Sequence, residues 1–134
     1  MKNARQRLAG WGEAYAAAYL QQRGYRIIER NARTPYGEID LVAVEASEMG
    51  QILAESKPVT VFVEVKTRRS TRYGYPEQAV TRRKREHMLA AAQAYLQAHP
   101  ELEGDWRVDV IAVFRPDSKQ TATVNHFENA IRDD

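Results

Sequence analysis

Two short segments, residues 37–44 and 62–66, carry charged side chains at the alternating spacing of β-strands. Because successive side chains of a strand point to opposite faces, Glu38 and Asp40 share one face of the first segment, and Glu64 and Lys66 share one face of the second. An antiparallel hairpin would place Asp40 opposite Glu64, with Cβ atoms roughly 5 Å apart. A divalent cation with oxygen ligands removes the repulsion between two such carboxylates, and a nearby lysine suits an anionic substrate. The pattern is typical of a metal site that hydrolyses phosphodiesters.

An ordinary alternative exists for the same residues. A Glu-x-Lys pattern on a strand is commonly a solvated face with a cross-strand ion pair. A slip of one residue in the strand pairing would also turn Asp40 to the other face of the sheet. Valine-rich flanks argue instead that both strands are buried, where unpaired charges are costly. Burial therefore favours a functional cluster over a solvated face.

Basic side chains concentrate directly after the second segment. Residues 66–85 hold eight of the 20 Lys and Arg residues and only one acid, Glu77, and Tyr73 and Tyr75 lie among them. Clustered cations release counterions from a phosphate backbone, which gives sequence-independent affinity for nucleic acid. A solvated loop and helix face is the alternative explanation of a charge run. The predicted nucleic-acid-binding residues are Arg68, Arg69, Arg72, Arg82, Arg83, Lys84 and Arg85.

Length and composition indicate one domain over residues 1–134. The chain has 134 residues and 43% hydrophobic residues, which is enough for a core, and it has no cysteine for a disulfide or a thiolate metal site. The basic N-terminus leads into an amphipathic pattern without the apolar region of a signal peptide. No apolar run approaches the roughly 20 residues of a membrane span. We therefore expect a cytoplasmic protein without membrane contact.

The periodicity of apolar residues predicts an α/β fold in the order αβββαββ, with two long helices flanking a mixed β-sheet. A strand-helix-strand crossover should make the strand after the second helix parallel to the one before it. The expected elements are a helix over 3–23, strands over 25–30, 38–45 and 59–67, a helix from Pro76 to about Ala98, and strands over 106–114 and about 121–127.

The sequence also supports predictions for Glu13, for the Arg107 and Asp109 pair, and for the three histidines. Glu13 has small neighbours one helical turn away, which would let its helix pack closely and carry the carboxylate to the sheet, although most helical glutamates have no specific role. Asp109 beside Arg107 is a candidate buried ion pair. The histidines lack ligand spacing and are explained by surface positions: His87, His99 and His126.

The spaced set of motif residues resembles the uncharacterised bacterial YraN-like family. The matching residues are Gly12-Glu13-Ala14, Gly24-Tyr25, Asn31, Gly37-Glu38-Ile39-Asp40-Leu41, Phe62-Val63-Glu64-Val65-Lys66 and Lys84. That family is similar to the archaeal Holliday junction resolvases of the restriction-endonuclease-like superfamily, which carries the PD-(D/E)XK motif. The likeness spans residues 6 to about 114. Ile39 replaces the motif proline.

The resemblance implies a restriction-endonuclease-like core and a metal-dependent endonuclease acting on DNA, with branched or junction DNA as a candidate substrate. Asp40, Glu64 and Lys66 would be catalytic, and Asp40, Glu64 and Glu13 would bind Mg²⁺ or Mn²⁺. A homodimer would suit symmetric cutting of two strands. One alternative is a non-catalytic nucleic-acid-binding or adaptor protein that keeps the nuclease fold. A module without any nucleic-acid role would leave the basic run unexplained.

Overall fold

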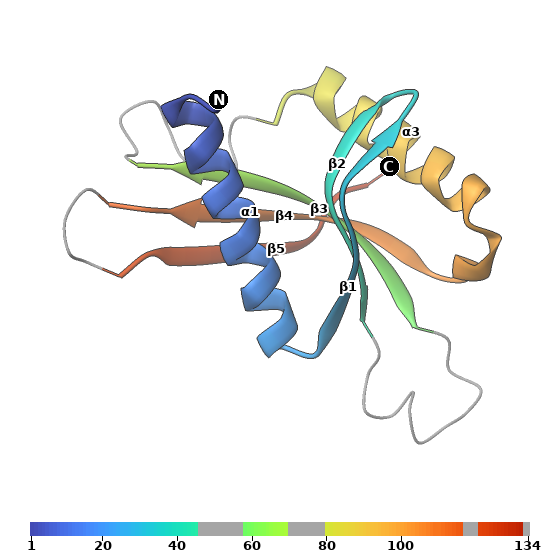
Figure 1. The fold of residues 1–134 in the computed structure, drawn as a ribbon. Coiled ribbons are helices and arrows are strands. Elements are labelled where there is room, and N and C mark those ends of the chain that lie inside the picture. Colours follow the sequence, from blue (N-terminus) through green and yellow to red (C-terminus); the bar gives the residue numbers. More distant parts are fainter. Residues whose placement is uncertain (46–57, 70–79, 117–120, 133–134) are drawn as a thin grey trace.

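A five-stranded mixed sheet with one long helix on each face organises the chain (Figure 1). The computed structural model describes residues 1–45, 58–69, 80–116 and 121–132. The elements in chain order are α1 (Ala4–Gln22), β1 (Tyr25–Thr34), β2 (Gly37–Glu45), β3 (Val59–Arg68), α3 (Arg82–Ala98), the short 3₁₀ helix η2 (Pro100–Leu102), β4 (Trp106–Phe114) and β5 (Thr123–Ile131). The predicted order αβββαββ is confirmed.

Sheet topology follows the chain, with the strands in the spatial order β1-β2-β3-β4-β5. Strands β3 and β4 are parallel, as the crossover through α3 requires, and the other neighbours are antiparallel. Strand β3 is therefore central and is buried along most of its length. Its pairing with β2 joins Leu41 to Val63, so the next residues along, Asp40 and Glu64, stand opposite one another as predicted.

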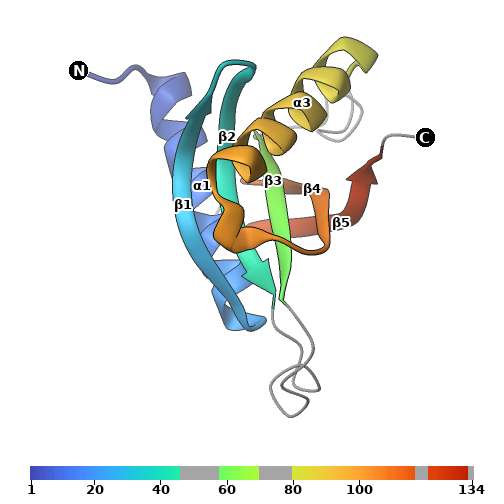
Figure 2. The same cartoon turned by 90° about the vertical axis from the view of Figure 1, so that its right-hand side faces the viewer.

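Two hydrophobic cores lie on the two faces of this sheet, because alternate strand residues point to opposite sides. Leu41 and Val63 pack with Leu20 of α1 on one face. Val42 and Phe62 pack with Tyr95 of α3 on the other. Figure 2 shows the two helices on opposite sides of the sheet. In the described part of the chain, no helix is long and apolar enough to cross a membrane.

Helix boundaries are set by capping side chains. The Asn3 side chain accepts a hydrogen bond from the Gln6 N–H, and the Gln6 side chain accepts one from the Asn3 N–H, so α1 begins within one residue of its expected start. The expected start of the second helix, Pro76, lies outside the described residues, but Val80 and Thr81, which the prediction made helical, precede the helix. Thr81 has an extended backbone and its hydroxyl accepts from the Lys84 N–H, which begins α3 at Arg82.

The first and last strands extend beyond their predicted ends, Arg30 and Phe127. Strand β1 continues to Thr34 and β5 to Ile131, and each pairing contains an irregularity in register. Asn31 and Asn129 have positive φ values of 53° and 52°, a conformation that asparagine tolerates better than most residues. The shift in β1 falls between Ile27 and Glu29, and the shift against β5 falls between Val108 and Val110; such irregularities allow pairing to resume after a local kink. Asparagine is common in turns, and for this reason the two strands were predicted to end before Asn31 and Asn129.

Candidate active site

The candidate site begins where β2 and β3 stop pairing through their backbones. The paired residues end at Leu41 and Val63, and the Asp40 carboxylate then accepts a hydrogen bond from the Val65 N–H at 2.8 Å. The Asp40 side chain thus accepts the hydrogen bond that a backbone carbonyl of β2 would otherwise accept from β3. The half-buried Asp40 carboxylate is held in place by this bond, beside Glu64 of the neighbouring strand.

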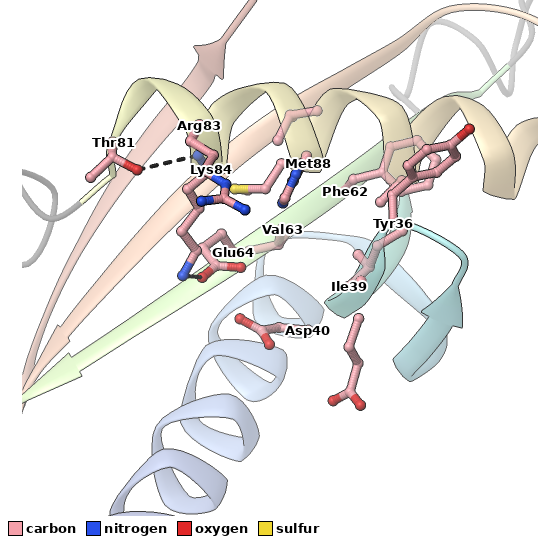
Figure 3. Close-up of a pocket in the computed structure, with 15 residues that line it drawn as sticks. Tyr36, Ile39, Asp40, Phe62, Val63, Glu64, Thr81, Arg83, Lys84 and Met88 are labelled. Atoms are coloured by element: carbon pink, nitrogen blue, oxygen red, sulfur yellow. Dashed lines mark hydrogen bonds and ion pairs between the residues drawn. The ribbon is translucent and has the colours of Figure 1, made fainter.

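Glu64 is the centre of the cluster. Its side chain is buried, with a residue exposure of 8%, and its Oε1 atom contacts the Nζ atoms of Lys66 at 3.1 Å and Lys84 at 2.8 Å. Lys66 lies two residues further along β3, whereas Lys84 reaches across from the first turn of α3 (Figure 3). One carboxylate oxygen therefore binds ammonium groups from a strand and from a helix, although Lys84 was expected at a nucleic-acid surface.

Burial and neighbouring charges shift the pKa values of the residues in this cluster. Burial and the charge of Glu64 raise the pKa of Asp40 to about 8, so Asp40 favours its protonated form unless a cation compensates. Burial, together with Lys84, lowers the pKa of Lys66. Burial also acts to lower the pKa of Lys84, but its bonds to Glu64 and Lys66 and the charges of Glu64 and Asp40 together outweigh burial and raise that pKa. The two lysines differ in character, and Lys66 releases a proton more readily than an ordinary lysine.

Glu13 approaches the cluster because α1 packs unusually close to β3. A Cβ atom added to Gly12 would lie 1.8 Å from Thr67 Oγ1, so only glycine permits this approach. Asn31 bridges Glu13 and Glu38 when its amide nitrogen faces both carboxylates, at 3.2 and 2.9 Å. Burial and the charge of Glu38 raise the pKa of Glu13. The expected close packing of this helix is confirmed, and Glu13 lies in a second acidic layer with Glu38.

The donor set fits a hard divalent cation at Asp40 and Glu64. Both supply carboxylate oxygens, and Mg²⁺ is commonly held by one or two carboxylates together with water and substrate phosphate. The raised pKa of Asp40 shows the repulsion that such a cation would relieve. Among the described residues, however, no three His, Asp or Glu side chains form a ready metal-binding group. Glu13 is therefore not part of a preassembled three-carboxylate set.

A cleft of about 470 Å³ opens beside the cluster, between α3 and the β1–β2 hairpin. Asp40, Glu64, Arg83 and Lys84 give part of its wall a strongly charged character. The rest of the wall is mixed. Glu38, Thr81 and His87 are polar, and the aromatic and apolar side chains are those of Tyr36 on the hairpin turn and of Ile39, Phe62, Met88, Ala91 and Val108. Figure 3 shows the charged group and the aromatic group at different ends of the view.

Comparison with known proteins places this chain among bacterial relatives. The sequence profile of the uncharacterised protein family UPF0102 matches residues 12–113. The chain belongs to the UPF0102 family. Strand, helix and cluster residues of the candidate site, from Glu13 to Lys84, all fall within the matched range. Membership of the family identified from the sequence motifs is confirmed.

Individual UPF0102 relatives match over most of their length. The UPF0102 protein of Syntrophomonas wolfei subsp. wolfei is 45% identical over 120 residues, which cover 90% of this chain and 93% of the relative. The UPF0102 protein of Syntrophotalea carbinolica is 43% identical over 123 residues, covering 92% and 89%. That of Herpetosiphon aurantiacus is 36% identical over 132 residues, covering 96% of each chain.

The basic run of this UPF0102 protein is divided by the fold. Arg83 and Lys84 line the cleft, whereas the exposed Arg85 borders a separate hollow formed with β4 and β5. Arg82 is exposed and pairs with Glu86 at 3.4 Å on the helix surface. Arg68 and Arg69 are exposed at the end of β3. Arg72, Tyr73 and Tyr75 lie outside the described residues, so their predicted contribution to a binding surface stays a prediction.

A second buried polar cluster in this UPF0102 protein lies on the α1 face. Asp109 has 0% exposure and binds Arg107 Nε at 3.0 Å and His126 Nε2 at 2.7 Å, which confirms the expected ion pair. His126 also contacts the Tyr19 hydroxyl at 3.2 Å, so its predicted surface position is wrong. Burial acts to raise the pKa of Asp109, but its bonds to His126 and Arg107 outweigh burial and lower it. The cluster joins α1, β4 and β5, and its satisfied bonds indicate a structural role.

Proposed function

We propose that this protein is a divalent-metal-dependent nuclease that hydrolyses phosphodiester bonds in DNA. The observation that carries the proposal is the opposed pair Asp40 and Glu64, with two lysine ammonium groups on Glu64, beside an open cleft. Opposed carboxylates that favour a proton or a cation, next to groups suited to phosphate, are the parts that metal-assisted phosphodiester hydrolysis uses. The motif resemblance to the PD-(D/E)XK superfamily supports the same conclusion.

Asp40 and Glu64 would hold Mg²⁺ or Mn²⁺, with Glu13 reaching the ion through water. The bound ion would activate a water molecule and neutralise charge on the phosphate oxygens. The water oxygen attacks phosphorus and the bond to the leaving sugar oxygen breaks. Lys66, whose pKa is lowered by burial, would in its neutral amine form accept the proton that the water loses, and the departing sugar oxygen would take a proton from solvent. Lys84 keeps its charge and is placed to contact the phosphate.

The proposed partner is nucleic acid, with DNA junctions or branches as candidate substrates from the family resemblance. Exposed Arg82 and Arg83 at the start of α3 supply positive charge near the cleft. Arg68 and Arg69 extend the proposed contact surface along β3. A homodimer would let two such sites cut two strands symmetrically. We also propose a cytoplasmic location, because DNA substrates of bacteria occur in that compartment.

The direct test measures strand scission by the purified protein on labelled branched, linear and single-stranded substrates in Mg²⁺ or Mn²⁺. We expect scission that chelation abolishes, and we expect Asp40→Asn and Lys66→Ala to lower the rate by orders of magnitude. Arg26→Ala, at an exposed position on β1, is the matched surface control. Scission that is demonstrably the protein's own and persists unchanged in Asp40→Asn would contradict the assignment of these residues.

One observation favours a second candidate, a non-catalytic nucleic-acid-binding protein. Both lysines occupy the same Glu64 oxygen, and the described residues hold no ready three-ligand metal group. A cluster of this kind is satisfied without metal, as a structural ion-pair network would be. Firm DNA binding without scission of any substrate, in either metal, would select this candidate.

A further inference from the structure

Tyr36 is unusual among the described residues because it is a large aromatic side chain left in solvent. Its exposure is 54%, and the only other large hydrophobic residue exposed in the described part of the chain is the terminal Met1. Exposed aromatic residues beside a cleft commonly mark a binding surface. Tyr36 lines the same cleft as the carboxylate cluster, so its exposure has a direct structural context.

The turn that carries Tyr36 is held rigidly. The Thr34 hydroxyl accepts a hydrogen bond from the Tyr36 N–H at 3.1 Å and donates one to the Gly37 carbonyl at 2.7 Å. Gly37 has φ = 126°, a conformation that other residues rarely adopt. The aromatic ring is thus presented by an ordered hairpin turn, which lowers the entropy lost when a ligand binds against it.

The two ends of the cleft differ in chemistry. Asp40, Glu64 and Lys84 lie toward one end and Tyr36 lies at the other with Ile39 and Phe62, whereas Met88 lies on α3 beside Lys84 (Figure 3). A nucleotide has the same division, because a charged phosphate is joined through its sugar to a flat base that stacks on aromatic and apolar side chains. The cleft volume of about 470 Å³ lies in the range of small-ligand sites.

We propose that the end of this cleft at Tyr36 receives one unpaired nucleobase of a strand whose phosphate lies at the carboxylate cluster. The inference rests on the proposed function and deepens it, because it names the substrate class. In continuous duplex each base is stacked and paired, so entry into a side cleft requires unstacking it. Single strands, frayed ends, flaps and junctions offer an unpaired base without that cost. Tyr36 therefore selects nucleic acid with unpaired nucleotides over continuous duplex.

Binding in chelator, where no strand is cut, tests the inference. The probe is a DNA strand with 2-aminopurine at an unpaired position, compared with the same strand in full duplex. We expect binding to quench the fluorescence of the unpaired probe. Tyr36→Ala should weaken single-strand affinity roughly five- to a hundredfold, as loss of one stacking contact does, and leave duplex affinity unchanged. Tyr36→Phe keeps the ring and should bind like the parent protein.

A second variant probes the helix side of the same hollow. Met88→Glu places a negative charge among the apolar side chains of the cleft wall, so it should weaken single-strand binding more than duplex binding. Gln93→Glu adds the same charge at an exposed position elsewhere on α3 and is the matched control. Circular dichroism of each variant checks that the fold is kept.

The outcomes separate this inference from the proposed function. Quenching and a Tyr36→Ala defect without any scission in Mg²⁺ or Mn²⁺ would support base capture and contradict the nuclease. Scission that depends on Asp40, together with equal single-strand binding by the parent, Tyr36→Ala and Met88→Glu, would overturn base capture and leave the nuclease. Absence of quenching on a bound single strand would also overturn it.

Discussion

Gly12 and Gly10 offer a pair of substitutions whose effects should have opposite signs. Both residues lie in α1, and replacing a helical glycine with alanine removes a penalty of roughly 1 kcal/mol. A Cβ atom on Gly10 meets nothing within 4 Å, whereas a Cβ atom on Gly12 meets Thr67 Oγ1 at 1.8 Å and Thr67 Cβ at 2.9 Å. Rotating the Thr67 side chain moves Oγ1 but leaves its Cβ in place. The helix or the strand must therefore move.

The expected magnitudes follow from these contacts. Gly10→Ala should stabilise the protein by about 0.5–1 kcal/mol. Overpacking in a well-packed interface costs about 1–3 kcal/mol, so Gly12→Ala should be destabilised by a net amount of up to about 2 kcal/mol. Urea unfolding followed by circular dichroism measures both values. A stabilised Gly12→Ala protein would refute the close approach of α1 to β3.

A double-mutant cycle locates the effect. Thr67→Gly removes the atom that Gly12→Ala would strike, so the double variant should be less destabilised than the two single effects added together. Residues in contact usually show coupling free energies of about 0.5–3 kcal/mol, whereas distant residues show nearly none. Additive effects would place the strain elsewhere, because Gly12 and Thr67 would then not touch.

Three further predictions concern charge. Because the pKa of folded Asp40 is raised to about 8, metal-free protein should lose stability as pH rises from about 4 to 8, and Asp40→Asn should remove that loss, a gain of up to about 5 kcal/mol in thermal melts at pH 8. Asp109 has a lowered folded pKa, so its contribution is present above about pH 4 and lost as pH falls further; Asp109→Asn should cost about 3–5 kcal/mol at neutral pH and flatten the acid limb of the melts. Replacing Arg82, Arg83 and Arg85 with Gln should flatten the salt dependence of DNA binding by up to about three phosphate contacts, and an unchanged slope would place the binding surface elsewhere.

The strands of the central sheet could be predicted because burial imposes a regular alternation on them. Leu41 and Val63 face one core while Val42 and Phe62 face the other, and a slip of one residue would reverse both faces. That constraint is what made the opposition of Asp40 and Glu64 predictable. Lys84 lies on α3 one turn before Met88, and its contact with Glu64 depends on how α3 docks.

Features that depend on tertiary contacts could not be predicted from the sequence pattern. His126 lies far along the chain from Tyr19 and Asp109, so its burial has no local signal. The start of α3 depends on which hydroxyl caps the helix, and proline at residue 76 is an equally good local start signal. The sequence places Tyr36 in a turn, but it does not predict the cleft that Tyr36 lines.

The register between β2 and β3 has a consequence for folding errors. If β3 slipped by one residue, Glu64 and Lys66 would turn toward the apolar core under α1, and Val63 and Val65 would turn away from it. Burying unpaired charges in such a core is costly, so the slipped sheet would be a poor kinetic trap. The charged side chains of β3 thus discourage misassembly before any substrate arrives. A chain whose sheet has formed stably has, for the same physical reason, already brought its two opposed carboxylates together.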